Sequence, residues 1–152
     1  TFTYGAPSAS VAPPERSEAG AAAGDGDTGD PARAAQAGAG DGRVTVEVPV
    51  TNTGDRAGTE VVQVYVAGPS GSAGEPVQQL RGFDRLSLAP GETRTARIVL
   101  PPRAFAAWDP SAGGWQVAAG RHELRVGSSS RAIHATVAVE LDARPLDPQE
   151  LP

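Results

Sequence analysis

Residues 43–66 read RVTVEVPVTNTGDRAGTEVVQVYV, and this stretch decides the fold. Valine occupies every second position from residue 44 to residue 50, and again from residue 62 to residue 66. This period of two is typical of β-strands that bury one face. Between the two runs, Asn52-Thr53-Gly54-Asp55 has the composition of a turn. The stretch therefore predicts two antiparallel strands. Pro49 cannot donate a backbone hydrogen bond, so we expect it at a sheet edge or a bulge.

The alternation continues to residue 141 and predicts further short strands at residues 80–88, 92–100, 120–126 and 133–141. The leucines of the first of these runs and Phe83 have opposite parity, so Gly82 beside Phe83 predicts a bulge. About seven short strands in about 100 residues are typical of an immunoglobulin-like, antiparallel all-β sandwich.

Composition excludes several classes of protein. The chain has 152 residues and a net charge of −5, which suits one modest domain and is too short for a catalytic barrel of about 250 residues. The acidic balance and the lack of a basic stripe argue against nucleic acid, and the apolar runs are too short for a membrane helix. There is no cysteine, so disulfides and cysteine-based metal sites are excluded, and we expect no cofactor and no metal. Because methionine is also absent, we expect a piece of a longer chain.

The chain divides into four parts. Residues 1–11 read as the first strand of the sandwich, and residues 43–141 as the remainder of the domain. Residues 12–42 are rich in alanine, glycine and aspartate and predict a long flexible insertion after the first strand. The acidic run at residues 25–30 lacks the ligand spacing of a calcium loop. Residues 142–152 form a tail, in which two prolines are expected to end any strand.

Four motifs in order resemble a known module. They are residues 50–66, residues 79–93, residues 105–109 and residues 120–131. With Thr1-Phe2-Thr3-Tyr4 at the start, they resemble the fibronectin type III-like domain at the C-terminus of glycoside hydrolase family 3 enzymes, the β-glucosidases and their relatives. The likeness covers residues 1–8 and 43–140, and it implies a fibronectin type III-like sandwich.

The sequence departs from this module in two places. The long insertion stands where the family has a short loop, and His122 stands where the family usually has tyrosine. That position matches the tyrosine corner of sandwich folds. We expect His122 to be a core residue that donates one ring N–H to a backbone carbonyl, rather than a catalytic histidine.

Catalytic chemistry is not expected from this chain alone. Retaining glycosidases need two carboxyl groups about 5–5.5 Å apart, and the resemblance places these in upstream barrel and α/β domains. We interpret Glu60, Asp84, Asp109 and Glu123 as ordinary solvated carboxylates. A serine–histidine triad is formally possible, because residues 128–130 are serines and two histidines exist, but no nucleophile elbow is present.

The aromatic residues Phe105, Trp108 and Trp115 are the candidate contacts with another domain or with a sugar. A chain with so few aromatics needs them for packing, so we expect a non-catalytic accessory domain that packs on and stabilises upstream catalytic domains of a β-glucosidase-like parent. Through that parent the chain would contribute to carbohydrate metabolism and lie near its glycoside substrate. One alternative is a carbohydrate-binding module that uses Trp108 and Trp115, and another is an adhesive sandwich.

Overall fold

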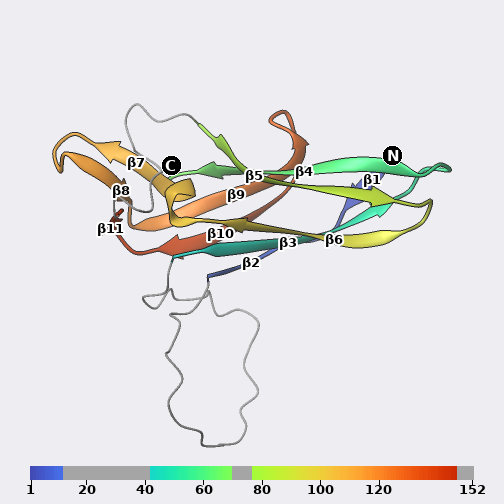
Figure 1. The fold of residues 1–152 in the computed structure, drawn as a ribbon, viewed down its shortest axis with the longest axis horizontal. Helices are drawn as coiled ribbons and strands as arrows, with labels where there is room; N and C mark the ends of the chain where they lie inside the picture. Colours follow the sequence, from blue (N-terminus) through green and yellow to red (C-terminus); the bar gives the residue numbers. More distant parts are fainter. Residues whose placement is uncertain (12–41, 70–76, 147–152) are drawn as a thin grey trace, which may run out of the picture.

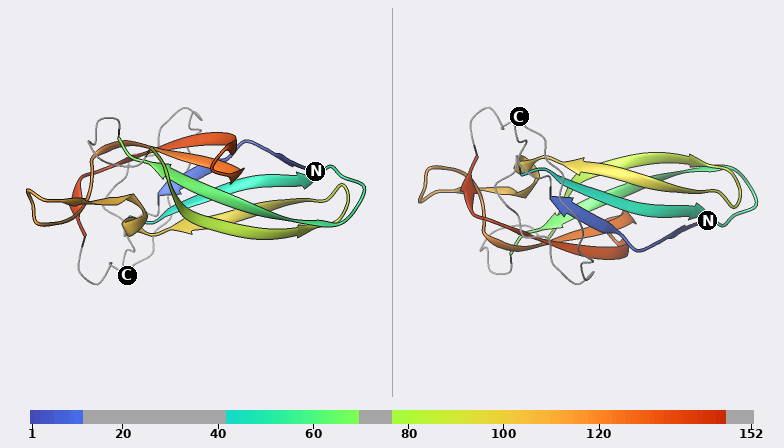
Figure 2. Two further views of the ribbon diagram at one scale, coloured as in Figure 1. Left: turned by 90° about the horizontal axis from the view of Figure 1, so that it is seen from above. Right: turned by 90° about the horizontal axis from the view of Figure 1, so that it is seen from below.

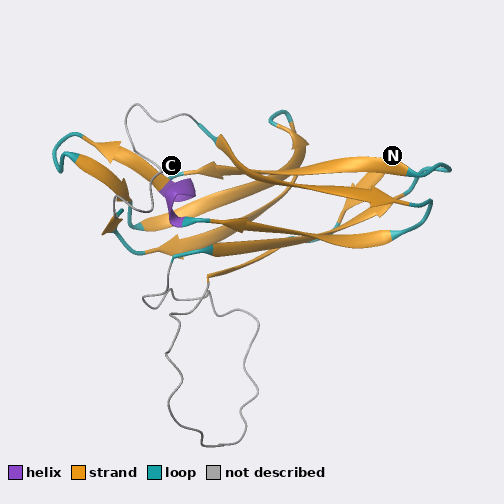
Figure 3. Ribbon diagram, viewed as in Figure 1, coloured by secondary structure: helices purple, strands orange, loops and turns teal. Residues whose placement is uncertain are grey.

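The computed structural model describes residues 1–11, 42–69 and 77–146. The predicted insertion at residues 12–42, apart from Gly42, and the acidic run at residues 25–30 lie outside these described residues. Within the described ranges every strand pair is antiparallel, and the one helical element is the 3-10 turn η1 (Pro102–Phe105), shown in Figure 3. In the described part of the chain, no helix is long and apolar enough to cross a bilayer. The all-β prediction is confirmed.

Two sheets form the sandwich (Figure 1). The first is built on β3 (Val44–Asn52), which pairs along one side with β6 (Thr93–Leu100) and along the other with β1 (Phe2–Tyr4) and then β2 (Ser8–Val11). The second sheet has the order β10 (Ala132–Leu141), β9 (Gly120–Ser129), β4 (Gly58–Ala67) and β5 (Gln79–Leu88). Because β1 and β2 follow one another along the same edge, the sandwich has the seven strands that the sequence predicts.

The core lies between the two sheets and is built mainly of valine and leucine. Every second residue of β3 is fully buried, as the valine alternation predicts. Sandwiches gain most of their stability by burying one apolar face of each sheet in this way. The other strands contribute the following buried residues: Val62, Val64, Val66, Leu86, Leu88, Ala96, Ile98, Leu100, Leu124, Val126, Val139 and Leu141.

β3 pairs along both of its sides, so Pro49 does not lie in an edge strand; the other expectation, a bulge, is met, because residues 5–7 lie opposite only residues 48–49. The Pro49 carbonyl accepts a hydrogen bond from the Gly5 N–H at 2.8 Å, so its nitrogen points to the same side as its carbonyl, toward the β1–β2 edge. The ladder on that side is interrupted between the pairs Tyr4–Val50 and Ser8–Glu47. The missing N–H of Pro49 therefore falls where β1 ends and β2 has not begun.

The bulge predicted near Gly82 is present one residue earlier. The pairing of β4 with β5 shifts between Val64, opposite Gly82, and Tyr65, opposite Leu80, so Arg81 is the extra residue. A Cβ at Gly82 would lie 2.6 Å from Ile98 Cγ2, so glycine lets β5 approach β6 closely. The bulge also turns Leu80 and Phe83 to the same outer face.

A small third sheet was not predicted from the sequence. It contains the hairpin β7 (Ala106–Asp109) and β8 (Gly114–Val117), with β11 (Arg144–Pro145) paired to β8. The hairpin extends from the end of the sandwich opposite the N-terminus (Figures 1 and 2). β11 ends at Pro145, as expected of a proline in the tail, and Pro145 pairs with Gln116 as the last residue of this edge strand.

Candidate functional site

The β7–β8 hairpin carries both tryptophans. Trp108 and Trp115 are direct cross-strand partners, and their rings meet edge to face, with centroids 6.1 Å apart and planes at 78°. Such pairs stabilise a hairpin beyond the area that they bury. Trp108 nevertheless remains 54% exposed and Trp115 40% exposed. The hairpin therefore presents a large apolar surface that this domain does not cover.

Asp109 holds the turn of the hairpin in shape. Its Oδ1 accepts hydrogen bonds from the Ser111 hydroxyl at 2.6 Å, the Ser111 N–H at 2.8 Å and the Ala112 N–H at 3.3 Å. These bonds, the Ser111 hydroxyl first, lower the pKa of the Asp109 carboxyl. Gly113 follows with a φ of 65°, which suits glycine at this point of the turn. Asp109 is thus an ionised structural carboxylate rather than a proton donor.

A pocket of about 410 Å³ lies at the base of the hairpin. Its lining includes Trp108, Asp109 and Gln116 from the hairpin, and Phe105 and His122 from the sandwich side. The tail closes the outer edge of the hairpin, because the Leu146 N–H donates to the Trp115 carbonyl at 3.0 Å and the Leu146 side chain is buried. The tail therefore holds in place the hairpin that carries the exposed tryptophans.

Phe105 differs from the two tryptophans. It is buried in the core of this domain and packs edge-on against His122, with ring centroids 5.6 Å apart. Its side chain has almost no surface to offer to a neighbouring domain or a sugar, so the expectation for Phe105 is corrected. Phe105 lies in the 3-10 turn η1, which has no period of two, so the sequence pattern could not predict its burial.

His122 occupies the corner position as expected. Its side chain is 1% exposed, and its Nε2 lies 3.0 Å from the carbonyl oxygen of Ala118, four residues upstream. A carbonyl only accepts hydrogen bonds, so Nε2 carries the proton. His122 thereby makes the bond to upstream backbone that a corner tyrosine makes.

The four carboxylates that we interpreted as non-catalytic all make structural contacts within the domain. Glu60 accepts from the Tyr4 hydroxyl at 2.6 Å, and Glu123 pairs with Arg125 at 2.9 Å. Asp84 accepts from the backbone of Arg85 at 2.8 Å and of Arg97 at 3.2 Å. Asp109 caps its turn as described above.

One serine–histidine contact does form. The Ser128 hydroxyl lies 3.3 Å from His134 Nε2 on the exposed outer face of β9 and β10. His134 also contacts the Tyr4 ring, which stacks on it at a centroid distance of 4.2 Å. The stacking of Tyr4 on His134 joins the two sheets. Ser128 does not lie on the strained strand-to-helix turn that a nucleophile elbow requires. Among the described residues, no group of three or more histidine, cysteine or acidic side chains could hold a metal ion.

A second exposed apolar surface was missed by the sequence reading. We call it the Phe83 surface; it consists of Leu80 and Phe83 of β5 and Val99 of β6, and Phe83 is 68% exposed. These residues line a shallow pocket of about 420 Å³ with Arg81 and Arg97. The sequence does contain a signal for this surface. Leu80 and Phe83 have opposite parity, and one extra bulge residue between them places both on the same outer face.

Residues 60–130 match the family model of the fibronectin type III-like domain. A β-glucosidase of Rhizobium radiobacter is 46% identical over 97 residues, which are 64% of this chain and 12% of the relative. An exo-α-(1→6)-L-arabinopyranosidase of Bifidobacterium longum is 45% identical over 98 residues, which are 64% of this chain and 13% of the relative.

Solved structures agree with these relatives. A GH3 β-glucosidase of Bifidobacterium adolescentis is similar over 97% of this chain and 18% of that structure, with a TM-score of 0.72 and 30% identity. β-Glucosidase 3B of Thermotoga neapolitana is similar over 97% of this chain and 17% of that structure, with a TM-score of 0.71 and 29% identity. The chain thus spans only about an eighth of the length of the curated relatives that it matches. It is a fibronectin type III-like domain of the kind found in family 3 β-glucosidases.

Proposed function

We propose that this chain is a non-catalytic accessory domain that packs on and stabilises the upstream catalytic domains of a family 3 glycoside hydrolase. The observation that carries the proposal is the short match, about an eighth of each curated relative, to enzymes that are otherwise several times longer. Their remaining length supplies the domains on which this one would pack. The parent activity proposed is the release of terminal sugars from β-glucosides or related glycosides.

The exposed apolar surfaces support this role. Trp108 and Trp115 on the hairpin and Phe83 on the sandwich leave large aromatic area in water, which an isolated domain gains nothing by exposing. Interfaces between proteins are enriched in such aromatic residues. We propose the tryptophan pair as the main contact with the catalytic domains and the Phe83 surface as a second contact.

Two measurements test the proposal. The isolated chain is expected not to hydrolyse an aryl β-glucoside above the buffer background, whereas the longer chain encoded by the gene is expected to do so. Removing this domain from the longer chain is expected to lower its melting temperature. Turnover by the isolated chain that is lost on mutating Glu60, Asp84, Asp109 or Glu123 would contradict the proposal.

Carbohydrate binding is the second candidate, and the exposure of both tryptophans beside a pocket favours it. Sugar rings stack flat on aromatic faces, but the planes of Trp108 and Trp115 meet at 78°, so both rings cannot lie against one sugar face. Co-sedimentation of the isolated chain with insoluble glucan separates the two functions: binding supports the sugar module, and its absence supports the accessory domain.

A further inference from the structure

One ring nitrogen of His122 has no hydrogen-bond partner in the part of the chain that the structure describes. Nε2 donates to the Ala118 carbonyl, so in the neutral ring Nδ1 is a hydrogen-bond acceptor. Phe105 packs edge-on against the ring, with the two planes at 87°, and so holds its orientation. Nδ1 is buried and has no hydrogen-bond partner among the described residues. A buried acceptor left in this condition is costly.

Arg81 presents the complementary atom. It is the extra residue of the β5 bulge, and its Nε–H is a buried donor without a partner. In the described part of the chain, these two are the only buried side-chain nitrogen or oxygen atoms that lack a partner. Nearly all buried polar groups in folded proteins are satisfied by protein or by ordered water.

Both residues line the same small cavity. It measures about 20 Å³ and is bordered by Arg81 and Gln79 of β5, by Phe105 of η1 and by His122 of β9. One water needs roughly 10–15 Å³ of such volume and two to four polar partners. The cavity is therefore large enough for a single water and far too small for a sugar.

We propose that this cavity binds one structural water, which accepts a hydrogen bond from Arg81 Nε–H and donates one to His122 Nδ1. The water joins β5 to β9 across β4, the strand that lies between them. It also fixes the Arg81 side chain at the rim of the Phe83 surface, whose pocket Arg81 lines. Histidine at the corner requires this water because it has a second polar side-chain atom, whereas tyrosine has only its hydroxyl.

The test is nuclear magnetic resonance on the full 15N-labelled chain. We expect nuclear Overhauser cross-peaks from a long-lived water to Arg81 Hε and to the His122 ring proton between its nitrogens. We also expect a His122 nitrogen spectrum with the proton on Nε2. In Arg81→Met, which removes the donor and keeps the methylene stem, the His122 cross-peak to water should be lost.

Arg97→Met is the matched control, because Arg97 is an exposed arginine of the adjacent strand, and it should leave the His122 cross-peak unchanged. His122→Phe gives the reciprocal reading: the Arg81 Hε cross-peak to water should be lost. Absence of both cross-peaks in the unaltered chain, persistence of the His122 cross-peak in Arg81→Met, or a proton on His122 Nδ1 would overturn the proposal.

Discussion

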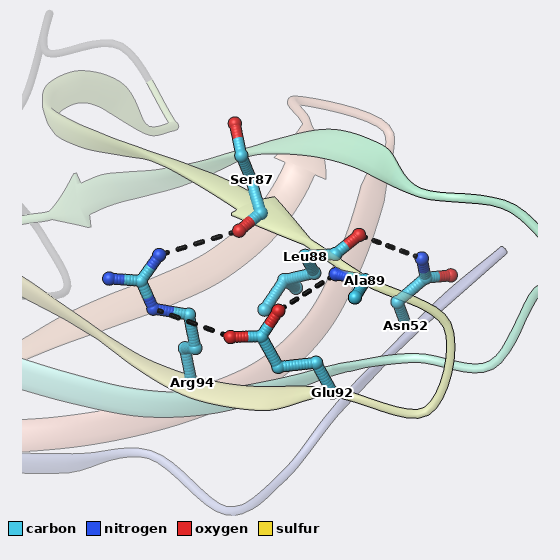
Figure 4. Close-up of polar contacts among 6 residues, drawn as sticks. All are labelled: Asn52, Ser87, Leu88, Ala89, Glu92 and Arg94. Carbon is cyan, nitrogen blue, oxygen red and sulfur yellow. Dashed lines mark hydrogen bonds and ion pairs between the residues drawn. The ribbon is translucent and has the colours of Figure 1, made fainter.

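Asn52 shows how one buried polar side chain fixes an end of the sandwich. It is 1% exposed, its Nδ2 donates to the carbonyls of Arg56 at 2.8 Å and Leu88 at 3.1 Å, and its Oδ1 accepts from the Gly54 N–H at 3.0 Å. Figure 4 shows the bond to Leu88 beside the neighbouring turn, in which Glu92 accepts from the Ala89 N–H. The side chain thus joins the turn after β3 to the end of β5.

Asn52→Ala is expected to lower the free energy of unfolding by about 2–3 kcal/mol, because it removes three hydrogen bonds, one of them to the buried Leu88 carbonyl and two to half-buried backbone groups. Urea denaturation measures this. Asp55→Ala, an exposed change in the same turn, is the control and should stay within about 0.5 kcal/mol. Equal effects of the two changes would contradict the assigned role of Asn52.

At the scale of strands, Tyr4 of β1 joins the first sheet to the second. Its hydroxyl donates to Glu60 of β4 at 2.6 Å, and its ring stacks on His134 of β10. Partial burial, followed by the hydrogen bond to Glu60 and the charge of Glu60, raises the pKa of Tyr4 well above its ordinary value. The folded chain therefore keeps the Tyr4 proton at a pH where the unfolded chain loses it.

The pH dependence follows from this difference. Below about pH 10 both states keep the proton, so stability is unaffected; above it the unfolded chain binds fewer protons, and the free energy of unfolding falls as the pH rises. Solvent screening keeps the slope below the limit of about 1.4 kcal/mol per pH unit. Tyr4→Phe should flatten this fall, as measured by denaturation between pH 9 and 11. No lysine or cysteine complicates this pH range, because the chain has neither. Tyr65→Phe, which removes the other tyrosine, is the control: the fall in the free energy of unfolding that is due to Tyr4 should remain.

The β9–β10 hairpin depends on a close backbone approach at Gly127. Its pairing shifts on either side of Ile133, and a Cβ at Gly127 would lie 2.2 Å from the Ala132 carbonyl oxygen. Gly127→Ala should destabilise the chain by about 1–3 kcal/mol, because backbone rather than a flexible side chain must move. Gly114→Ala is the control, since nothing lies within 4 Å of its added Cβ. A melting temperature unchanged by Gly127→Ala would show that the hairpin relaxes freely.

Long alternating strands could be read from the sequence, whereas short elements could not. The valines of β3 and β4 repeat often enough to specify one buried face, which is why the seven-strand sandwich was predictable. The hairpin strands β7 and β8 have four residues each, too few for a period, and β11 forms only because β8 offers it an edge. The burial of Phe105 likewise could not be read, because it lies in a 3-10 turn that has no period of two.

For the whole molecule, the position of its tryptophans offers a direct probe of docking. The chain has only two tryptophans, and both lie on the β7–β8 hairpin at one end of the sandwich (Figure 2). Its tryptophan fluorescence therefore reports on this surface alone. We expect the isolated chain to show emission partly quenched by solvent, and the longer chain to bury these rings against its catalytic domains.

Trp108→Ala separates docking from sugar binding. In the isolated chain the change should cost little, because more than half of the side chain is already in water. In the longer chain it should lower stability by up to about 3 kcal/mol, the value of burying one large aromatic side chain, with kcat for an aryl β-glucoside unchanged in the fraction that remains folded. Thermal melts of both chains, with and without the change, measure the difference. If Trp108→Ala left the stability of both chains unchanged but abolished glucan binding, Trp108 would be a sugar-binding residue. A ring that packs against protein could not be removed without a loss of stability.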